Sequence, residues 1–167
     1  MATEDIVKVL DEIRRAEITA SIQYMAHHGE YENLGMEGLA KMSKKEAIEE
    51  MQHAEVLGER IYFLGGRPTH TPLRDAESSE DVLEMIAQDV KLEEEAIERL
   101  NAAIVLCLEE KDAGTRLMLE PILVDEERHI DELRMILTQI ERFGGGPMGA
   151  MMCVCGSGVP MGGGHPA

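Results

Sequence analysis

The segment Glu50-Met51-Gln52-His53 has a counterpart in Glu126-Glu127-Arg128-His129, which lies 76 positions further along the chain (126 − 50). A glutamate precedes each segment by 33 positions, Glu17 in the first case and Glu93 in the second (50 − 17 and 126 − 93). On a helix, residues at i and i+3 share a face, so each Glu-x-x-His segment directs a carboxylate and an imidazole toward one point. The repeat therefore predicts a helical bundle that holds a symmetric two-metal site.

The polar members of this repeat interrupt apolar stripes of helical period. Among the stripe residues are Ile6, Leu10, Ile13, Ala20 and Tyr24 around Glu17; Leu39, Met42, Glu46 and Leu57 around Glu50 and His53; Val82, Ile86, Asp89, Ala96 and Leu100 around Glu93; and Leu119, Ile122, Leu133 and Ile136 around Glu126 and His129. An unpartnered carboxylate on a core face costs on the order of several kcal/mol, which a bound metal would offset. Salt bridges among core polar residues are the alternative, purely structural interpretation.

The same periodicity predicts an all-α, ferritin-like four-helix bundle. Helices are expected at about 4–34, 37–64, 79–111 and 115–143, with Thr3 and Ser79 as N-cap candidates. Short connections make the first two helices antiparallel neighbours, and likewise the last two. The segment 65–78 spans roughly 45 Å when extended, enough to pass along a helix of roughly 40 Å. It is therefore expected to form one long crossover between the second and third helices.

Composition limits the classes of protein that the chain can represent. Its 167 residues, 44% of them hydrophobic, suit one helical domain, expected at 1–143. The net charge of −17 argues against direct binding of nucleic-acid phosphates and favours attraction of cations. No apolar run is long enough for a membrane span and no signal peptide is recognisable, so a cytoplasmic location is expected.

The last residues, 144–167, are rich in Gly, Met and Cys and predict a flexible tail with no clear fifth helix. Cys153 and Cys155 lie in this segment. A soft-metal or redox role for the Cys-x-Cys pair is the alternative to a tail without a site.

Over about residues 4–143 the chain resembles a bacterioferritin. The resemblance rests on Glu17, Tyr24, Glu93 and the segments 48–55 (Ile-Glu-Glu-Met-Gln-His-Ala-Glu) and 125–131 (Asp-Glu-Glu-Arg-His-Ile-Asp). It implies that Glu17 and His53 bind one iron, that Glu93 and His129 bind the other, and that Glu50 and Glu126 bridge the di-iron centre. It also implies an iron-storage protein with ferroxidase activity, which oxidises Fe(II) with oxygen or hydrogen peroxide and stores the product as a mineral in a hollow shell.

Two further residues acquire a role only through the resemblance. Tyr24 is either an ordinary core residue or a redox-active or hydrogen-bonding tyrosine beside the metals. Met51 lies roughly 160° around the helix from His53, so it should face outward. It is either packing at a subunit contact or one of two axial ligands, one from each subunit, of a heme b or related iron porphyrin. A ferredoxin-type reductant is the partner that such a protein is expected to use.

The resemblance also predicts a homo-oligomeric shell built from dimers. Bacterioferritin shells have 24 subunits and use a short fifth helix, which residues 144–167 are not expected to form, so 12 subunits are slightly favoured. The inner-surface iron histidine of some bacterioferritins would fall near Lys45.

Two other di-metal enzymes remain as alternatives. A rubrerythrin-like peroxidase normally carries two Cys-x-x-Cys pairs, which three cysteines cannot supply. A manganese catalase-like enzyme uses similar ligands, and carboxylate with imidazole suits manganese as well as iron.

Overall fold

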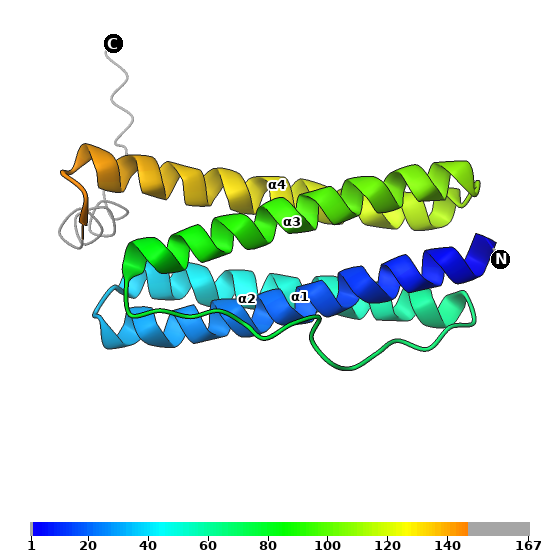
Figure 1. Cartoon of the computed structure of the whole chain (residues 1–167), viewed down its shortest axis with the longest axis horizontal. Coiled ribbons are helices and arrows are strands. Elements are labelled where there is room, and N and C mark those ends of the chain that lie inside the picture. Colours follow the sequence, from blue (N-terminus) through cyan, green and yellow to red (C-terminus); the bar gives the residue numbers. More distant parts are fainter. Residues whose placement is uncertain (1, 147–167) are drawn as a thin grey trace, which may run out of the picture.

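The computed structural model describes residues 2–146 as a bundle of four α-helices (Figure 1). The helices are α1 (Ala2–Asn33), α2 (Glu37–Phe63), α3 (Val82–Glu109) and α4 (Ala113–Arg142). The described part of the chain contains no strand, which confirms the all-α class. None of its helices combines the length and the apolar character that crossing a membrane requires. Residues 147–167, with Cys153 and Cys155, lie outside the described range.

The helix limits agree with the predicted ones to within a few residues, but both predicted N-caps are wrong. The N-cap of α3 is Asp81, whose side chain accepts a hydrogen bond from the Glu84 amide at 2.9 Å. Ser79 lies before the helix, because the buried stripe of α3 starts only at Val82, directly after Asp81. Thr3 lies within α1, which already begins at Ala2.

Short turns pair α1 with α2 and α3 with α4 as antiparallel neighbours (Figure 1). The connection between α2 and α3 differs, because it runs the length of the bundle along α1 and starts α3 at the opposite end. Hydrogen bonds fix this crossover to α1: Arg15 donates to the carbonyl of Pro72 at 3.0 Å, and the Thr69 amide donates to Asp11 at 2.6 Å. The predicted crossover is thus present and is anchored along its course.

Two apolar clusters fill the two ends of the bundle and leave a polar layer between them. One cluster includes Leu10, Ile13, Leu57, Ile61, Leu100 and Leu119, and the other includes Tyr31, Leu39, Met85, Ile86, Leu133 and Ile140. Each fully buried side chain of this kind contributes roughly 1.5–3 kcal/mol to folding. In each helix, the members of the Glu and Glu-x-x-His repeat lie between these two clusters. The apolar packing on either side therefore fixes their positions.

Candidate metal centre

The structure brings the six repeated residues together at mid-bundle, from all four helices. They form two groups whose ligand atoms lie within 4.8 Å of one another. One group consists of Glu17, Glu50, His53 and Glu126, and the other of Glu50, Glu93, Glu126 and His129. Glu50 and Glu126 belong to both groups and therefore occupy the middle of the centre.

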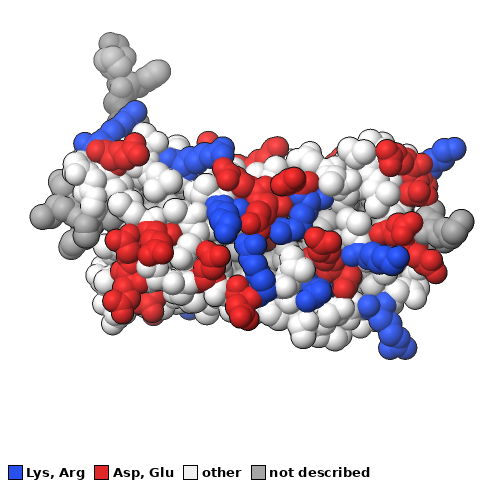
Figure 2. Space-filling view, viewed as in Figure 1, with Lys and Arg blue, Asp and Glu red and all other residues white. Residues whose placement is uncertain are grey.

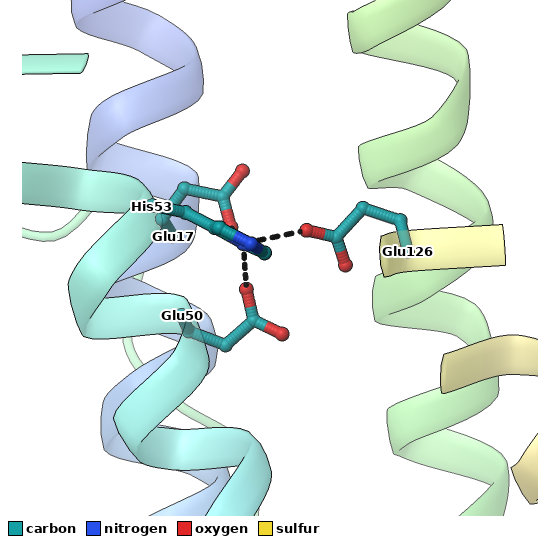
Figure 3. A group of neighbouring side chains, drawn as sticks. All are labelled: Glu17, Glu50, His53 and Glu126. Carbon is teal, nitrogen blue, oxygen red and sulfur yellow. Dashed lines mark hydrogen bonds and ion pairs between the residues drawn. The ribbon is translucent and has the colours of Figure 1, made fainter. Parts of the chain in front are cut away.

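The first group surrounds Nδ1 of His53 (Figure 3). This nitrogen lies 3.0 Å from Oε1 of Glu126 and 3.2 Å from Oε2 of Glu50. Oε2 of Glu17 is 4.0 Å away. One imidazole nitrogen and three carboxylates thus converge on a single point.

The second group repeats this arrangement around Nδ1 of His129. Oε1 of Glu50 lies at 3.0 Å, Oε2 of Glu126 at 3.3 Å and Oε1 of Glu93 at 3.7 Å. Glu50 and Glu126 therefore each present one carboxylate oxygen to His53 and the other to His129. This is the geometry that a carboxylate needs to bridge two cations.

The centre is buried and its hydrogen bonding is incomplete. All six residues are buried, with a relative exposure of 7% or less for each whole residue. Atoms without a hydrogen-bond partner include Glu17 Oε1, Glu50 Oε1, Glu93 Oε2, both carboxylate oxygens of Glu126 and Nδ1 of His129. Buried polar atoms normally have partners, and oxygen and imidazole donors suit Fe, Mn or Zn. The donor set therefore fits a pair of such cations.

The pKa shifts of the buried groups show that bound protons neutralise part of the negative charge of the centre. Burial raises the pKa of Glu17 well above its ordinary value, and the neighbouring Glu126 and Glu50 carboxylates raise it further. Burial alone would lower the pKa of His53, but the facing carboxylates of Glu126 and Glu50 raise it to about 10. Burial alone would raise the pKa of Glu126, but the imidazoles of His129 and His53 beside it hold it well below its ordinary value. Bound cations would replace the protons on the imidazoles.

The second ring nitrogen of each histidine, Nε2, also faces at least one carboxylate. The sequence assigned no role to these carboxylates. Nε2 of His53 lies 3.3 Å from Oδ2 of Asp125. Nε2 of His129 lies 2.5 Å from Oε2 of Glu46 and 3.0 Å from Oε2 of Glu49. Such a partner orients the ring and increases its basicity as a ligand. The position of Glu46 on the apolar stripe of α2 was the available signal.

Glu46, Glu49 and His129 form a third group of possible metal ligands. The positively charged side chains of Lys45 and Arg128 already pair with its carboxylates. Lys45 Nζ lies 3.2 Å from Glu46 and 3.3 Å from Glu49, and Arg128 Nη2 lies 2.5 Å from Glu49. The lysine at position 45 thus forms salt bridges with both glutamates.

Comparison with known proteins places this centre in a family. Residues 7–143 match the family model described as a ferritin-like domain. The chain is 34% identical over 140 residues to a bacterioferritin of Mycolicibacterium paratuberculosis, covering 84% of this chain and 88% of the relative. It is 38% identical over 140 residues to a bacterioferritin of Streptomyces coelicolor, covering 84% of each. A Rhodobacter capsulatus bacterioferritin is 34% identical over 142 residues, covering 83% of this chain and 86% of the relative.

The chain belongs to the bacterioferritin family. This confirms the resemblance drawn from the motifs, and the structure confirms the four-helix bundle. Two residues that the resemblance singled out lie outside the set of candidate ligands.

Tyr24 of this bacterioferritin lies against the centre. Its side chain is fully buried, and its hydroxyl donates a hydrogen bond to Oε1 of Glu93. Burial raises the pKa of Tyr24, and the carboxylate of Glu93 raises it further, so the phenol keeps its proton. Tyr24 therefore supports one of the candidate ligands directly.

Met51 lies on the opposite side of α2 from the centre. Its exposed fraction is 62%, whereas Glu50 is fully buried. Ile48 on the same helix, and Ile22 and Met25 on α1, are also exposed large hydrophobic residues. Met51 thus faces outward on a helix pair that exposes other large apolar side chains.

Proposed function

We propose that this chain is an iron-storage protein whose buried centre is a ferroxidase. Glu17 and His53 hold one Fe(II), Glu93 and His129 hold the other, and Glu50 and Glu126 bridge them. The observation that carries this proposal is the orientation of Glu50 and Glu126, each with one oxygen toward His53 and one toward His129. Two cations held side by side in this way can react as a pair.

A bridged pair suits the oxidation because peroxide accepts two electrons at once. Two Fe(II) ions lose one electron each, and the O–O bond of hydrogen peroxide breaks as it takes up both electrons. With water, the products are two ferric oxyhydroxide units and four protons. Four carboxylates also stabilise the higher charge of Fe(III) better than neutral ligands would. Dioxygen can begin the same chemistry by accepting two electrons and two protons to become hydrogen peroxide.

Tyr24 is proposed to act beside the metals by holding Glu93 in the orientation that binds iron. Its hydroxyl is the donor to Oε1 of Glu93, and burial keeps it protonated. Because the ring touches a ligand of the second metal, it is also placed to donate an electron when peroxide exceeds the available Fe(II).

We further propose that Met51 binds a heme b or related iron porphyrin, paired with Met51 of a second subunit. The exposed thioether supports this, as do the exposed apolar side chains of Ile22, Met25 and Ile48 on the same helix pair. A bis-thioether pair favours Fe(II) heme, so the bound group would pass electrons from a ferredoxin-type reductant to stored iron. Dimers of this kind would build a closed shell in the cytoplasm, with 12 subunits favoured over 24.

The proposed ferroxidase is tested by substituting Glu126 by Ala, with Glu127→Ala as the matched control. Glu127 is adjacent in sequence but exposed, so its loss leaves the centre unchanged. Glu126→Ala should abolish rapid Fe(II) oxidation and reduce the two Co(II) ions bound per chain, while the helical circular dichroism signal stays. Unchanged initial oxidation rates in Glu126→Ala would refute the assignment. Parallel loading with Mn(II) tests the manganese alternative, because only that alternative expects peroxide turnover with manganese.

A further inference from the structure

A small cavity lies between the proposed metal pair and the face of the bundle that carries the crossover. Glu17 and Glu126 lie at its inner end, and Ala16, Ala20 and Ala96 form part of its wall. Its volume is about 10 Å³, enough for a single molecule of the size of water. The cavity lies between α1, α3 and the crossover, and neither Lys45 nor Arg128 lines it.

Three charged side chains meet at the outer end of this cavity, and we call them the gate cluster: Arg74, Glu95 and Arg99. Arg74 lies 2.7 Å and Arg99 3.1 Å from Oε2 of Glu95. Burial alone would raise the pKa of Glu95, but the hydrogen bonds from both arginines lower it, so all three groups are charged. Figure 2 shows basic and acidic side chains side by side near the middle of this face.

The crossover holds Arg74 in this position. The hydroxyl of Thr19, which also lines the cavity, accepts a hydrogen bond from the Leu73 amide at 3.0 Å. The Leu73 amide also lies 3.0 Å from the carbonyl of Arg15. The backbone next to Arg74 is therefore fixed, while its side chain is 37% exposed and held by the ion pair with Glu95. Partly exposed ion pairs are weak, and such side chains change rotamer rapidly.

The size of the cavity and the charges at its outer end determine which molecules can pass through it. Between Glu17 and Glu126 at one end and the gate cluster at the other, the alanines, Leu73 and Leu92 give the wall little polar surface that could replace the water shell of a cation. The two guanidinium groups of the gate cluster are balanced by Glu95 and by Glu12, which lies 3.8 Å from Arg99, so the outer end offers Fe(II) no net attraction. A small uncharged molecule meets neither obstacle.

We propose that this cavity is the passage by which a small uncharged oxidant, dioxygen or hydrogen peroxide, reaches the metal pair, and that Arg74, Glu95 and Arg99 control its opening. This inference rests on the proposed ferroxidase function. It assigns specificity-determining residues to that reaction at a site separate from the metal ligands. Iron then reaches the centre by another route.

The test uses the full chain in its native assembly, loaded with Fe(II) without oxygen and then mixed with dioxygen, hydrogen peroxide or tert-butyl hydroperoxide. Ala96→Leu should fill the passage and slow oxidation by hydrogen peroxide roughly tenfold or more, because access then limits the reaction. Arg74→Ala should open the mouth and accelerate oxidation, most for the bulky tert-butyl hydroperoxide. Whether dioxygen shares the passage follows from its response to Ala96→Leu.

Arg134→Ala is the matched control for Arg74→Ala. Arg134 forms a similar ion pair at 3.0 Å with Glu94, the sequence neighbour of Glu95, but more than half of each side chain is exposed and neither lines the cavity. Its removal should leave all three oxidation rates unchanged. Co(II) titration of every variant shows whether the metal pair still fills, independently of oxidation.

Two results would refute the proposal that the oxidant passes through this cavity. One is oxidation by hydrogen peroxide at the wild-type rate in an Ala96→Leu protein that still binds Co(II). The other is slower Co(II) binding in that variant, which would make the cavity a metal route. If Ala96→Leu fails to assemble, equal rates for Arg74→Ala and Arg134→Ala with every oxidant reject the proposal. A failure of the ferroxidase function itself is distinct, because the wild-type protein would then show no rapid oxidation.

Discussion

Nε2 of His129 lies 2.5 Å from Oε2 of Glu46, whose side chain is 4% exposed. The corresponding nitrogen of His53 instead meets Asp125 at 3.3 Å, and the Asp125 side chain is 47% exposed. The two halves of the centre, which repeat so closely in sequence, therefore differ in the support behind their histidines. A buried carboxylate at short range holds an imidazole more firmly than a hydrated one.

Removing these supports should affect the two metal positions unequally. We expect Glu46→Ala to weaken Co(II) binding at the His129 position by about 10–100-fold, because the ring loses its buried partner. Asp125→Ala should weaken binding at the His53 position less, because water replaces the exposed carboxylate. Co(II) titrations followed by visible absorption measure both effects. Equal losses in the two variants would contradict the asymmetry.

The metal-free protein should lose stability as the pH rises from about 7 to about 10. The pKa of His53 is raised from its ordinary value of 6.5 to about 10. A raised pKa contributes stability that is complete below the unfolded pKa and is lost as the pH rises through the folded one. The melting temperature of the metal-free protein should fall across this window. Zn(II)-loaded protein is the control, since the cation takes the place of the proton, and parallel curves for the two forms would count against the argument.

Tyr24→Phe and Tyr31→Phe should have opposite consequences although both tyrosines are buried in the same bundle. The Tyr24 hydroxyl donates to Glu93, whereas the Tyr31 hydroxyl has no hydrogen-bond partner among the described residues. Loss of the Tyr24 hydroxyl should cost roughly 1–3 kcal/mol of unfolding free energy, because a buried carboxylate loses its donor. Tyr31→Phe should be neutral or stabilising. Denaturant unfolding of the metal-free proteins compares the two, and an equal cost would disprove the assigned role of Tyr24.

Met51→Leu should abolish binding of the proposed porphyrin. Leucine keeps most of the apolar volume but removes the sulfur that would bind the iron. The measurement is the Soret absorption after expression with porphyrin supply, together with particle size. Met135→Leu, on the exposed surface of α4, is the control. Full retention of the porphyrin with the same axial spectrum in Met51→Leu would show that Met51 serves only for packing.

The native particle should be a closed shell that retains iron. Exposed large hydrophobic residues on α1 and α2, such as Ile22, Ile48 and Met51, favour a two-fold contact as the first assembly step. We expect a mass that corresponds to 12 subunits, with 24 as the alternative. Light scattering with iron analysis decides between them, and a monomer or an isolated dimer as the largest species would exclude both.

Periodicity predicted the ligand cluster because its members recur within single helices. Each Glu-x-x-His pair is a local feature of α2 or α4, and the apolar stripe around Glu17 indicated which face of α1 is buried. The contact between Glu46 and His129 was not predictable in this way, because it depends on how α2 and α4 are rotated against each other. The N-cap of α3 was also mispredicted, because Ser79 and Asp81 are both residues that can cap a helix and lie two positions apart.

The crossover was predicted as a connection, but its contribution to the cavity was not. A segment without periodicity gives no sign of where its side chains lie. The position of Arg74 follows from hydrogen bonds between the crossover and Thr19. Only the folded chain brings Arg74 next to Glu95.

The shared position of Glu50 and Glu126 has a consequence for how the centre fills. In the proposed centre, the cation that binds first would immobilise both carboxylates, and their second oxygens would then already point at the vacant half. The second cation would have less conformational entropy to remove, which would give positive cooperativity between the two halves. At limiting iron we therefore expect filled and empty chains to coexist. Half-filled chains, which could deliver only one electron and so release partly reduced oxygen, would stay rare.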